Sequence, residues 1–196
     1  MVIQGDTLEN SARRLLQERG VTMNDLAELV LFLQKDYIDN LTLDTCLESV
    51  DAVLTKREVH NAIITGVQLD ILAEENKLLS PLQEILTEDE GLYGIDEIMA
   101  LSIVNVYGSI GFTNYGYIDK VKPGILKELN AHDGEHVHTF LDDIVGAIAA
   151  AAASRLAHSQ PDLSFLFAGL LTSFLLNSNY LPCYVTVKNK QLKEVI

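Results

Sequence analysis

The sequence LDDIVGAIAAAAA at residues 141–153 decides the fold of this chain. From Ile144 onward the stretch is almost entirely apolar. A helix that is apolar on every side has no face to present to water and must be packed inside the protein. The stretch therefore predicts a close-packed inner helix, with two adjacent carboxylates, Asp142 and Asp143, at its start.

The rest of the chain shows the apolar spacing of helices and almost no strand alternation. Leu43, Cys46, Leu47 and Val50, for example, follow the i, i+3, i+4, i+7 pattern of an amphipathic helix. We therefore predict an all-α fold, a single-domain helical bundle over residues 1–196. The predicted helices lie near residues 6–19, 22–37, 42–53, 56–75, 81–88, 95–107, 117–129, 140–158 and 162–177.

Short local signals mark the boundaries of these helices. Thr55 and Glu58 have the spacing of a capping box, and Pro81 stands at a first helical position after Ser80. The glycines within residues 107–111 indicate a loop. Residues 183–187, Cys-Tyr-Val-Thr-Val, are the one β-prone run and predict a short C-terminal tail that folds back or pairs with another chain.

Charge and cysteine content narrow the partners and the compartment. The net charge is −14 and the pI is about 4.6, so this surface repels nucleic acid and anionic lipid. Cys46 and Cys183 have neither disulfide nor zinc spacing, and the N-terminus lacks the basic-then-apolar order of a secretory signal. We expect a cytoplasmic protein with no nucleic-acid partner and at most peripheral contact with the inner face of the membrane.

One uncharged segment, residues 163–187, tests this expectation. Its strictly apolar part, residues 163–176, is shorter than the about 20 residues that a membrane-spanning helix needs. We interpret it as a buried helix, and membrane association is the alternative.

Three carboxylate sites lie in apolar, helix-forming surroundings: Asp96-Glu97, Asp119 and Asp142-Asp143. Acids that a fold carries into its interior must be paired, protonated or bound to a metal. Because all five acids offer only oxygen atoms, they predict a site for a hard divalent cation such as Mg²⁺. The alternative is that Asp142 or Asp143 simply caps the following helix, since a carboxylate at a helix N-terminus accepts backbone N–H bonds.

Three basic residues lie near these acids in sequence. Lys122 shares a helical face with Asp119 and can neutralise the charge of a phosphate, and the alternative is a solvated surface lysine. His136 and His138 precede the aspartate pair in a polar segment. Either can donate a proton to a leaving oxygen, and the alternative is that both are solvated loop side chains.

Four tyrosines, Tyr93, Tyr107, Tyr115 and Tyr117, also surround the acids in sequence. They either line a pocket for an acyl or glyceryl group or pack in the core. The chain has no P-loop motif, no serine-hydrolase elbow and no Cys/His nucleophile arrangement, which disfavours those chemistries.

Three motifs, read in order, resemble the phosphatidylglycerophosphatase A family. They are GIDE at residues 94–97, YIDKVKP at residues 117–123 and FLDDIVG at residues 140–146. The family pattern has an Asp-Glu pair in an apolar helix, an aspartate three residues before Lys-Pro, and an Asp-Asp pair leading into a small-residue helix. Within the family the chain looks most like the soluble branch labelled low temperature requirement C protein, whose fold is an all-helical bundle around a central helix. The resemblance covers roughly residues 90–160.

The resemblance implies a Mg²⁺-dependent phosphatase that removes the terminal phosphate from phosphatidylglycerophosphate or a related phosphate ester. The predicted metal ligands are Asp96, Glu97, Asp119, Asp142 and Asp143, and the predicted catalytic residues are Asp119, Lys122 and His138.

The alternative function is a non-catalytic helical regulator that binds a divalent cation or a lipid headgroup. It is motivated by the first 90 residues, which lack the family's Ala-Pro-Gly-Thr motif. We also expect a homo-oligomer, which an exposed apolar helix face or the β-prone tail would favour.

Overall fold

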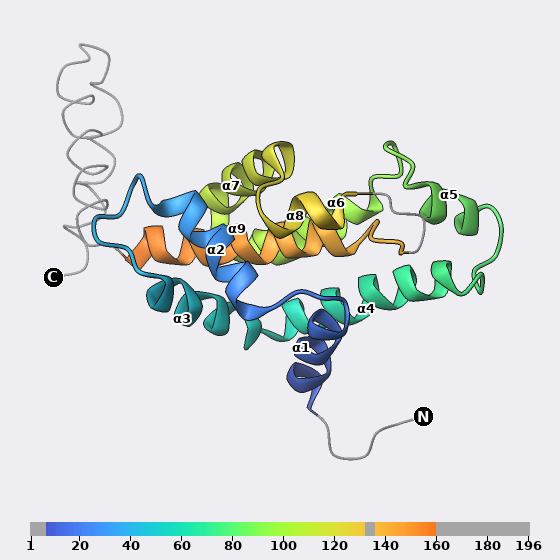
Figure 1. Ribbon diagram of the computed structural model, residues 1–196, viewed down its shortest axis with the longest axis horizontal. Helices are drawn as coiled ribbons and strands as arrows, with labels where there is room; N and C mark the ends of the chain where they lie inside the picture. The colour runs from blue at the N-terminus through green and yellow to red at the C-terminus, as the bar shows by residue number, and fades with distance from the viewer. Residues whose placement is uncertain (1–6, 132–135, 160–196) are drawn as a thin grey trace, which may run out of the picture. The chain divides into compact units, whose positions relative to one another are not determined.

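The computed structural model describes residues 7–131 and 136–159, and in these residues it is all helical, as predicted (Figure 1). Backbone contacts divide the chain into two compact units, Met1–Ala157 and His158–Ile196, and the fold below is that of the first. The predicted helix at residues 162–177 and the β-prone tail at residues 183–187 lie outside the described residues.

The described elements follow one another with short connections. In chain order they are α1 (Leu8–Glu18), α2 (Met23–Gln34), α3 (Leu43–Leu54), α4 (Arg57–Glu74), α5 (Leu82–Glu88), α6 (Ile95–Val104), the 3-10 helix η1 (Asn105–Tyr107), α7 (Gly108–Val121), α8 (Ile125–Leu129) and α9 (Leu141–Ser159).

The central element of the bundle is α9, the helix that the alanine run predicted. Of its 19 residues, only Asp142, Arg155, His158 and Ser159 are not buried. Figure 1 shows α9 running between α3 and α4 on one side and α6, α7 and α8 on the other. Because its side chains are mostly small and buried, neighbouring helices can approach its axis closely.

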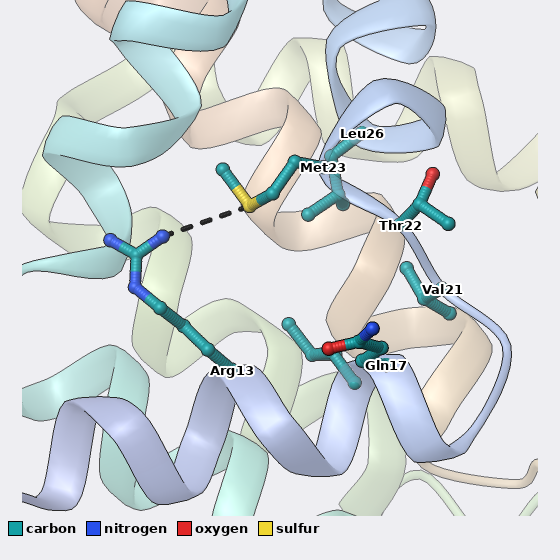
Figure 2. A pocket seen from close by; sticks show the side chains of 7 residues that line it. Arg13, Gln17, Val21, Thr22, Met23 and Leu26 are labelled. Carbon is teal, nitrogen blue, oxygen red and sulfur yellow. Dashed lines mark hydrogen bonds between the residues drawn. The ribbon is translucent and has the colours of Figure 1, made fainter.

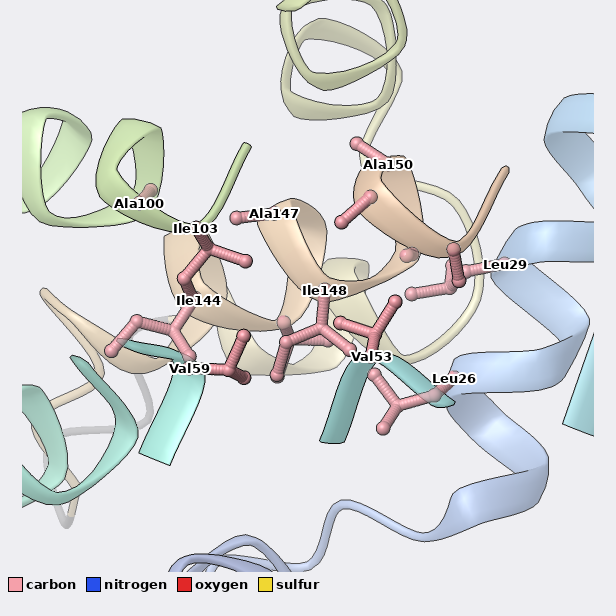
Figure 3. Packing of buried hydrophobic residues seen from close by; sticks show 14 of the residues in the cluster. Leu26, Leu29, Val53, Val59, Ala100, Ile103, Ile144, Ala147, Ile148 and Ala150 are labelled. Atoms are coloured by element: carbon pink, nitrogen blue, oxygen red, sulfur yellow. The ribbon is translucent and has the colours of Figure 1, made fainter. Parts of the chain in front are cut away.

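The core around α9 is formed by aliphatic side chains from several helices. Figure 3 shows Ile144 and Ile148 of α9 among Val53 and Val59, with Leu26 and Leu29 of α2 at one end. On another side of α9, Ala147 lies near Ala100 and Ile103 of α6 (Figure 3), and all of these side chains are buried.

Helix α4 packs tightly against α9 at Gly66. A Cβ atom at this position would lie 2.5 Å from Cδ1 of Ile144 and 2.9 Å from Cβ of Phe140. The absence of a side chain at Gly66 therefore sets the distance between the two helices, directly beside the residues that flank Asp142 and Asp143.

The predicted helix at residues 117–129 is wrong, because two helices share this region. Helix α7 begins at Gly108, inside the predicted loop, and ends at Val121. Lys122 has a left-handed backbone (φ 46°) and Pro123 follows it, so the chain stops being helical until α8. The preceding helix also ends earlier than predicted, at Val104, followed by η1 and by Gly108 with φ 71°.

The capping box predicted at Thr55 is also absent. The hydroxyl of Thr55 donates to the carbonyl of Ala52 at the end of α3, and Lys56 occupies the N-cap of α4 without a side-chain bond. A reciprocal capping box forms instead at Thr22, whose side chain and backbone are bonded to Asp25.

One stretch of the described residues has the length and composition of a membrane span, Ile95–Val121, with a mean hydropathy of 1.2. Length and composition alone are weak evidence, since core helices meet the same requirement. Here η1 and Gly108 divide the stretch into two helices. Residues 163–187, for which membrane association was the alternative, are not among the described residues.

Candidate metal site

The bundle brings the predicted site residues together from three helix ends. Asp96 and Glu97 lie in the first turn of α6, and Asp142 and Asp143 lie in the first turn of α9. Asp119 belongs to the last turn of α7, which ends next to Lys122. Helix N-termini favour negative charge and C-termini favour positive charge, so each charged group except Asp119 lies at a helix end that stabilises it.

Three of the five acids form one cluster. Asp96, Glu97 and Asp143 each offer a carboxylate oxygen, and these oxygens all lie within 4.8 Å of one another. Asp143 is buried, Asp96 is half-buried and Glu97 is exposed, so the cluster opens to solvent at Glu97. An arrangement of carboxylate oxygens that is open on one side suits Mg²⁺, which keeps several waters or phosphate oxygens in its coordination sphere.

The other two acids are paired with Lys122 instead. The Nζ atom of Lys122 lies 2.7 Å from Oδ2 of Asp142 and 3.0 Å from Oδ1 of Asp119. Oδ1 of Asp142 accepts the backbone N–H of Asp143 at 2.8 Å. Asp142 lies inside the first turn of α9 and accepts the N–H of the next residue, so it does not occupy the N-cap that the alternative prediction assigned to an aspartate, and Asp143 belongs to the acid cluster.

Burial and mutual repulsion make these carboxyl groups hold protons more strongly than usual. Burial, reinforced by the charge of Asp142, raises the pKa of Asp143 to about 8. Burial and a hydrogen bond with Glu97 raise the pKa of Asp96 to about 7. The pKa of Asp142 is also raised by burial, although Lys122 opposes the shift. A cation that replaces these protons would relieve the repulsion between the carboxylates.

Tyr115 of α7 adds a polar group to the buried side of the cluster. Its hydroxyl is buried beside the carboxylate of Asp143, and burial together with the charge of Asp143 and the hydrogen bond to it raises the pKa of Tyr115. The same hydrogen bond favours the charged form of Asp143. The all-oxygen donor set supports the assignment of this cluster as a cation site.

The other three tyrosines do not gather around one pocket. Tyr93 packs edge-on against the ring of Phe140, and the ring of Tyr117 stacks parallel to that of Phe32. Tyr107 accepts a hydrogen bond from Ser154 at its backbone carbonyl. Two of the four lie near the acid cluster, because the charge of Asp143 raises the pKa of Tyr115 and the charge of Asp96 adds to the effect of burial on the pKa of Tyr93.

His138 lies in the segment that leads into α9 and is half-buried. Its Nδ1 is 3.0 Å from the carbonyl oxygen of Leu129, so Nδ1 carries the proton and Nε2 is the atom that titrates. Burial lowers the pKa of His138. The rings of His136 and His138 stack with centroids 5.8 Å apart. A cavity of about 20 Å³ connects His138 with Asp142, and that volume suffices for one water.

A larger pocket lies elsewhere, between α1 and the start of α2 (Figure 2). It has a volume of about 340 Å³, and its wall includes Leu16, Val21 and Leu26, with Arg13 bonded to the sulfur of Met23 across it. No predicted site residue lines it, so its size does not make it the functional site.

The sequence did not indicate that Asp70 of α4 supports the site. Asp70 is fully buried, and its Oδ1 and Oδ2 accept the backbone N–H groups of Phe140 and Leu141 at 3.1 and 3.0 Å. It thus caps α9 from another helix. The available signal was its spacing, because Asp70 lies seven residues after Ile63 and three after Val67, on the apolar face of α4.

Comparisons with known proteins identify the family of the chain. The family model described as phosphatidylglycerophosphatase A matches residues 15–158. The uncharacterized protein YutG of Bacillus subtilis is 63% identical over 155 residues, which cover 79% of this chain and 93% of that protein.

Two solved structures share the fold over nearly their whole lengths. The low temperature requirement C protein from Listeria monocytogenes is 69% identical with a TM-score of 0.77, over 80% of this chain and 98% of that one. A protein of unknown function from Bacillus stearothermophilus is 63% identical with a TM-score of 0.76, over 81% and 98%. The chain therefore belongs to the phosphatidylglycerophosphatase A family, as its three motifs predicted.

Proposed function

We propose that this member of the phosphatidylglycerophosphatase A family is a Mg²⁺-dependent phosphatase that hydrolyses the terminal phosphomonoester of phosphatidylglycerophosphate or a related ester. The observation that carries the proposal is the convergence of Asp96 and Glu97 of α6 with Asp143 of α9 within 4.8 Å. Asp143 is far from the Asp96-Glu97 pair in the chain, and the mutual repulsion of the three carboxylates disfavours such a cluster unless a cation or protons neutralise it.

Asp96, Glu97 and Asp143 would hold the cation, which when bound supplies a Lewis acid for a phosphoryl oxygen and lowers the pKa of an attacking water. Asp143 and Tyr115 close the buried side of the cluster, and the exposed Glu97 marks the side from which an ester enters. Two residues close to Glu97 in the chain are apolar and exposed, since Leu92 is 93% exposed and Ile98 is 62% exposed. This supports an ester with an apolar part over a small polar one.

Lys122 is proposed to bind the phosphate. An ammonium group has three N–H donors, and Asp119 and Asp142 take two of them. The third is left for a phosphate oxygen, while the two carboxylates fix the direction of the side chain. Asp119 thereby acts by orienting Lys122, and the opposing charges of Asp142 and Asp119 raise the lysine pKa against the effect of burial, which keeps the ammonium charged.

His138 is proposed to carry a proton to the leaving oxygen through Nε2. The bond from Nδ1 to Leu129 fixes the ring, and the water-sized cavity leads from His138 toward Asp142. Because burial lowers the pKa of His138, the protonated form is scarce above neutral pH. Phosphate release that depends on His138 should accordingly fall as the pH rises.

The test is phosphate release from phosphatidylglycerophosphate and from a soluble glycerophosphate ester, each with and without Mg²⁺. Wild type is compared with Asp143→Asn and with a matched control, Asp44→Asn, which changes an exposed acid in the first turn of α3. We expect Mg²⁺-dependent release that Asp143→Asn abolishes and Asp44→Asn retains. Release that survives Asp143→Asn would refute the assignment.

The alternative function is a regulator that binds a cation or headgroup without turnover. It is distinguished by combining the phosphate-release assay with a measurement of the unfolding temperature. Mg²⁺ would raise the unfolding temperature of wild type, because a ligand that binds only the folded state stabilises it. No phosphate would be released from either ester.

A further inference from the structure

The segment that leads into α9 is held by hydrogen bonds to three other helices of the bundle, α4, α5 and α8. Asp70 accepts the N–H groups of Phe140 and Leu141, and Thr139 donates to the carbonyl of Leu86 at 2.8 Å. His138 is bonded to the carbonyl of Leu129. Every residue from 138 to 141 is thus fixed before the chain reaches Asp142.

Glu74, an acid of α4 one turn after Asp70, binds the backbone of Val137, the residue before this segment. Oε1 of Glu74 accepts the N–H of Val137 at 2.8 Å, and the two carboxylate oxygens of Glu74 bind the guanidinium of Arg19 at 2.6 and 2.9 Å. Arg19 also donates to the carbonyl of Val137 at 2.8 Å. The two acids of α4 therefore grip one short stretch of backbone at both of its ends.

Asp70 is the innermost of these contacts and has no other evident role. Its side chain is fully buried, and both of its carboxylate oxygens accept backbone N–H groups at the start of α9. A buried carboxylate is costly, and a core that needed only packing would place an apolar side chain there. Its bonds end one residue before Asp142 and two residues before Asp143.

We propose that Asp70 is a positioning residue of the cation site, which fixes the first turn of α9 so that the carboxylate of Asp143 meets those of Asp96 and Glu97. The inference rests on the proposed function, because it assumes that this cluster binds a divalent cation. Mg²⁺ demands near-ideal octahedral geometry, so a small shift of one ligand is enough to weaken binding. Outer groups that orient a ligand typically contribute 10-fold to 100-fold to metal affinity.

Asp70→Asn is the sharpest substitution, because it preserves shape and removes one acceptor. The carboxamide has one oxygen for two backbone N–H groups, and its NH₂ group would face the second of them. The start of α9 must then rotate or lose a bond. If Asp70→Asn fails to fold, Asp70→Ser replaces it, since a serine hydroxyl accepts one N–H without opposing the other.

The matched control is Ser49→Ala. Ser49 is also fully buried and also bonds to the backbone of α9 from another helix, with its hydroxyl donating to the carbonyl of Ala152 at 2.9 Å. Ala152 lies nine residues beyond Asp143, so this bond stabilises α9 without bearing on the acid cluster. Both variants should lower the unfolding temperature, and only the Asp70 variant should change cation binding.

The measurement is the dissociation constant of Mn²⁺, an oxygen-seeking substitute for Mg²⁺, read from the loss of the free-ion electron paramagnetic resonance signal. It is made on full-length protein at a temperature where circular dichroism shows each variant folded. We expect a loss of affinity of roughly tenfold or more in Asp70→Asn and wild-type affinity in Ser49→Ala. Equal affinity in wild type and the Asp70 variant would overturn the positioning role, as would an equal loss in Ser49→Ala. If wild type itself bound no Mn²⁺, the proposed function would fail first, and the two failures are therefore distinguishable.

Discussion

Replacing Gly66 by alanine tests whether close contact between α4 and α9 holds the site together. The added Cβ would lie 2.5 Å from Cδ1 of Ile144 and 2.9 Å from Cβ of Phe140. Carbon atoms in contact prefer about 3.5 to 4.0 Å. Cδ1 of Ile144 can turn away, but Cβ of Phe140 is attached to the backbone, so α9 must shift at the residues that flank Asp142 and Asp143.

The magnitude follows from two opposing effects. Alanine in place of glycine inside a helix stabilises by roughly 1 kcal/mol. Overpacking of this kind costs about 1 to 3 kcal/mol, so Gly66→Ala should lower the unfolding free energy by about 1 kcal/mol. Gly146 of α9 provides the control, because a Cβ there would meet Ile118, Tyr115 and Leu126 only at 3.7 to 3.9 Å, which is ordinary contact. Gly146→Ala should stabilise by up to about 1 kcal/mol, which leaves a difference of about 2 kcal/mol between the variants.

Urea unfolding followed by circular dichroism measures this difference directly. The same samples report the Mn²⁺ affinity, which should fall in Gly66→Ala because the shift moves the first turn of α9. If Gly66→Ala proved as stable as Gly146→Ala, the contact between the two helices would not be as close as the structure shows.

Two further predictions concern charge. With chelator present, the unfolding free energy should fall between pH 5 and 8, because the folded pKa of Asp143, about 8, exceeds that of an unfolded aspartate. The protonated form is thus favoured in the folded state, and stability is lost as the pH rises through this window, by on the order of 1 kcal/mol per unit for one proton. His138, whose pKa is lowered by burial, acts in the opposite sense near pH 6, so the comparison of wild type with Asp143→Asn by urea unfolding isolates the aspartate. Lys122→Met removes the ammonium between Asp119 and Asp142, so Mn²⁺ should bind more tightly while phosphate release falls; weaker Mn²⁺ binding in this variant would contradict the pairing.

The inner helix was predictable because its sequence leaves only one environment for it. A run of residues 144–153 that is apolar on all sides cannot face water, whatever the rest of the chain does. The three acid motifs could be recognised in the sequence, and the structure brings Asp96 and Glu97 together with Asp143. The division of the acids into a cluster of three and a pair held by Lys122 was not predictable, because it depends on how α6, α7 and α9 pack.

The errors have local causes that sequence patterns obscure. Helical spacing continues across Lys122, yet its left-handed backbone and the following proline end α7 there. Thr55 matches a capping box in spacing, but its hydroxyl closes α3. Asp70 was not among the predicted site residues, although its spacing places it on the apolar face of α4.

The distribution of charge over helix ends explains how this fold tolerates its acids without a cation. Asp96 and Asp143 lie at helix N-termini, whose partial positive charge stabilises each carboxylate by about 0.3 to 2 kcal/mol. Lys122 follows the negative C-terminus of α7 and neutralises Asp142. These effects leave the pKa of Asp143 still raised to about 8, so they offset only part of the cost of burial. A cation that neutralises the carboxylates would remove the remaining cost of burial. At a concentration 100 times its dissociation constant, the cation should raise the unfolding free energy by about 2.7 kcal/mol. A cluster built only for structural capping would show no such gain, since it would have no unneutralised charge for the cation to relieve.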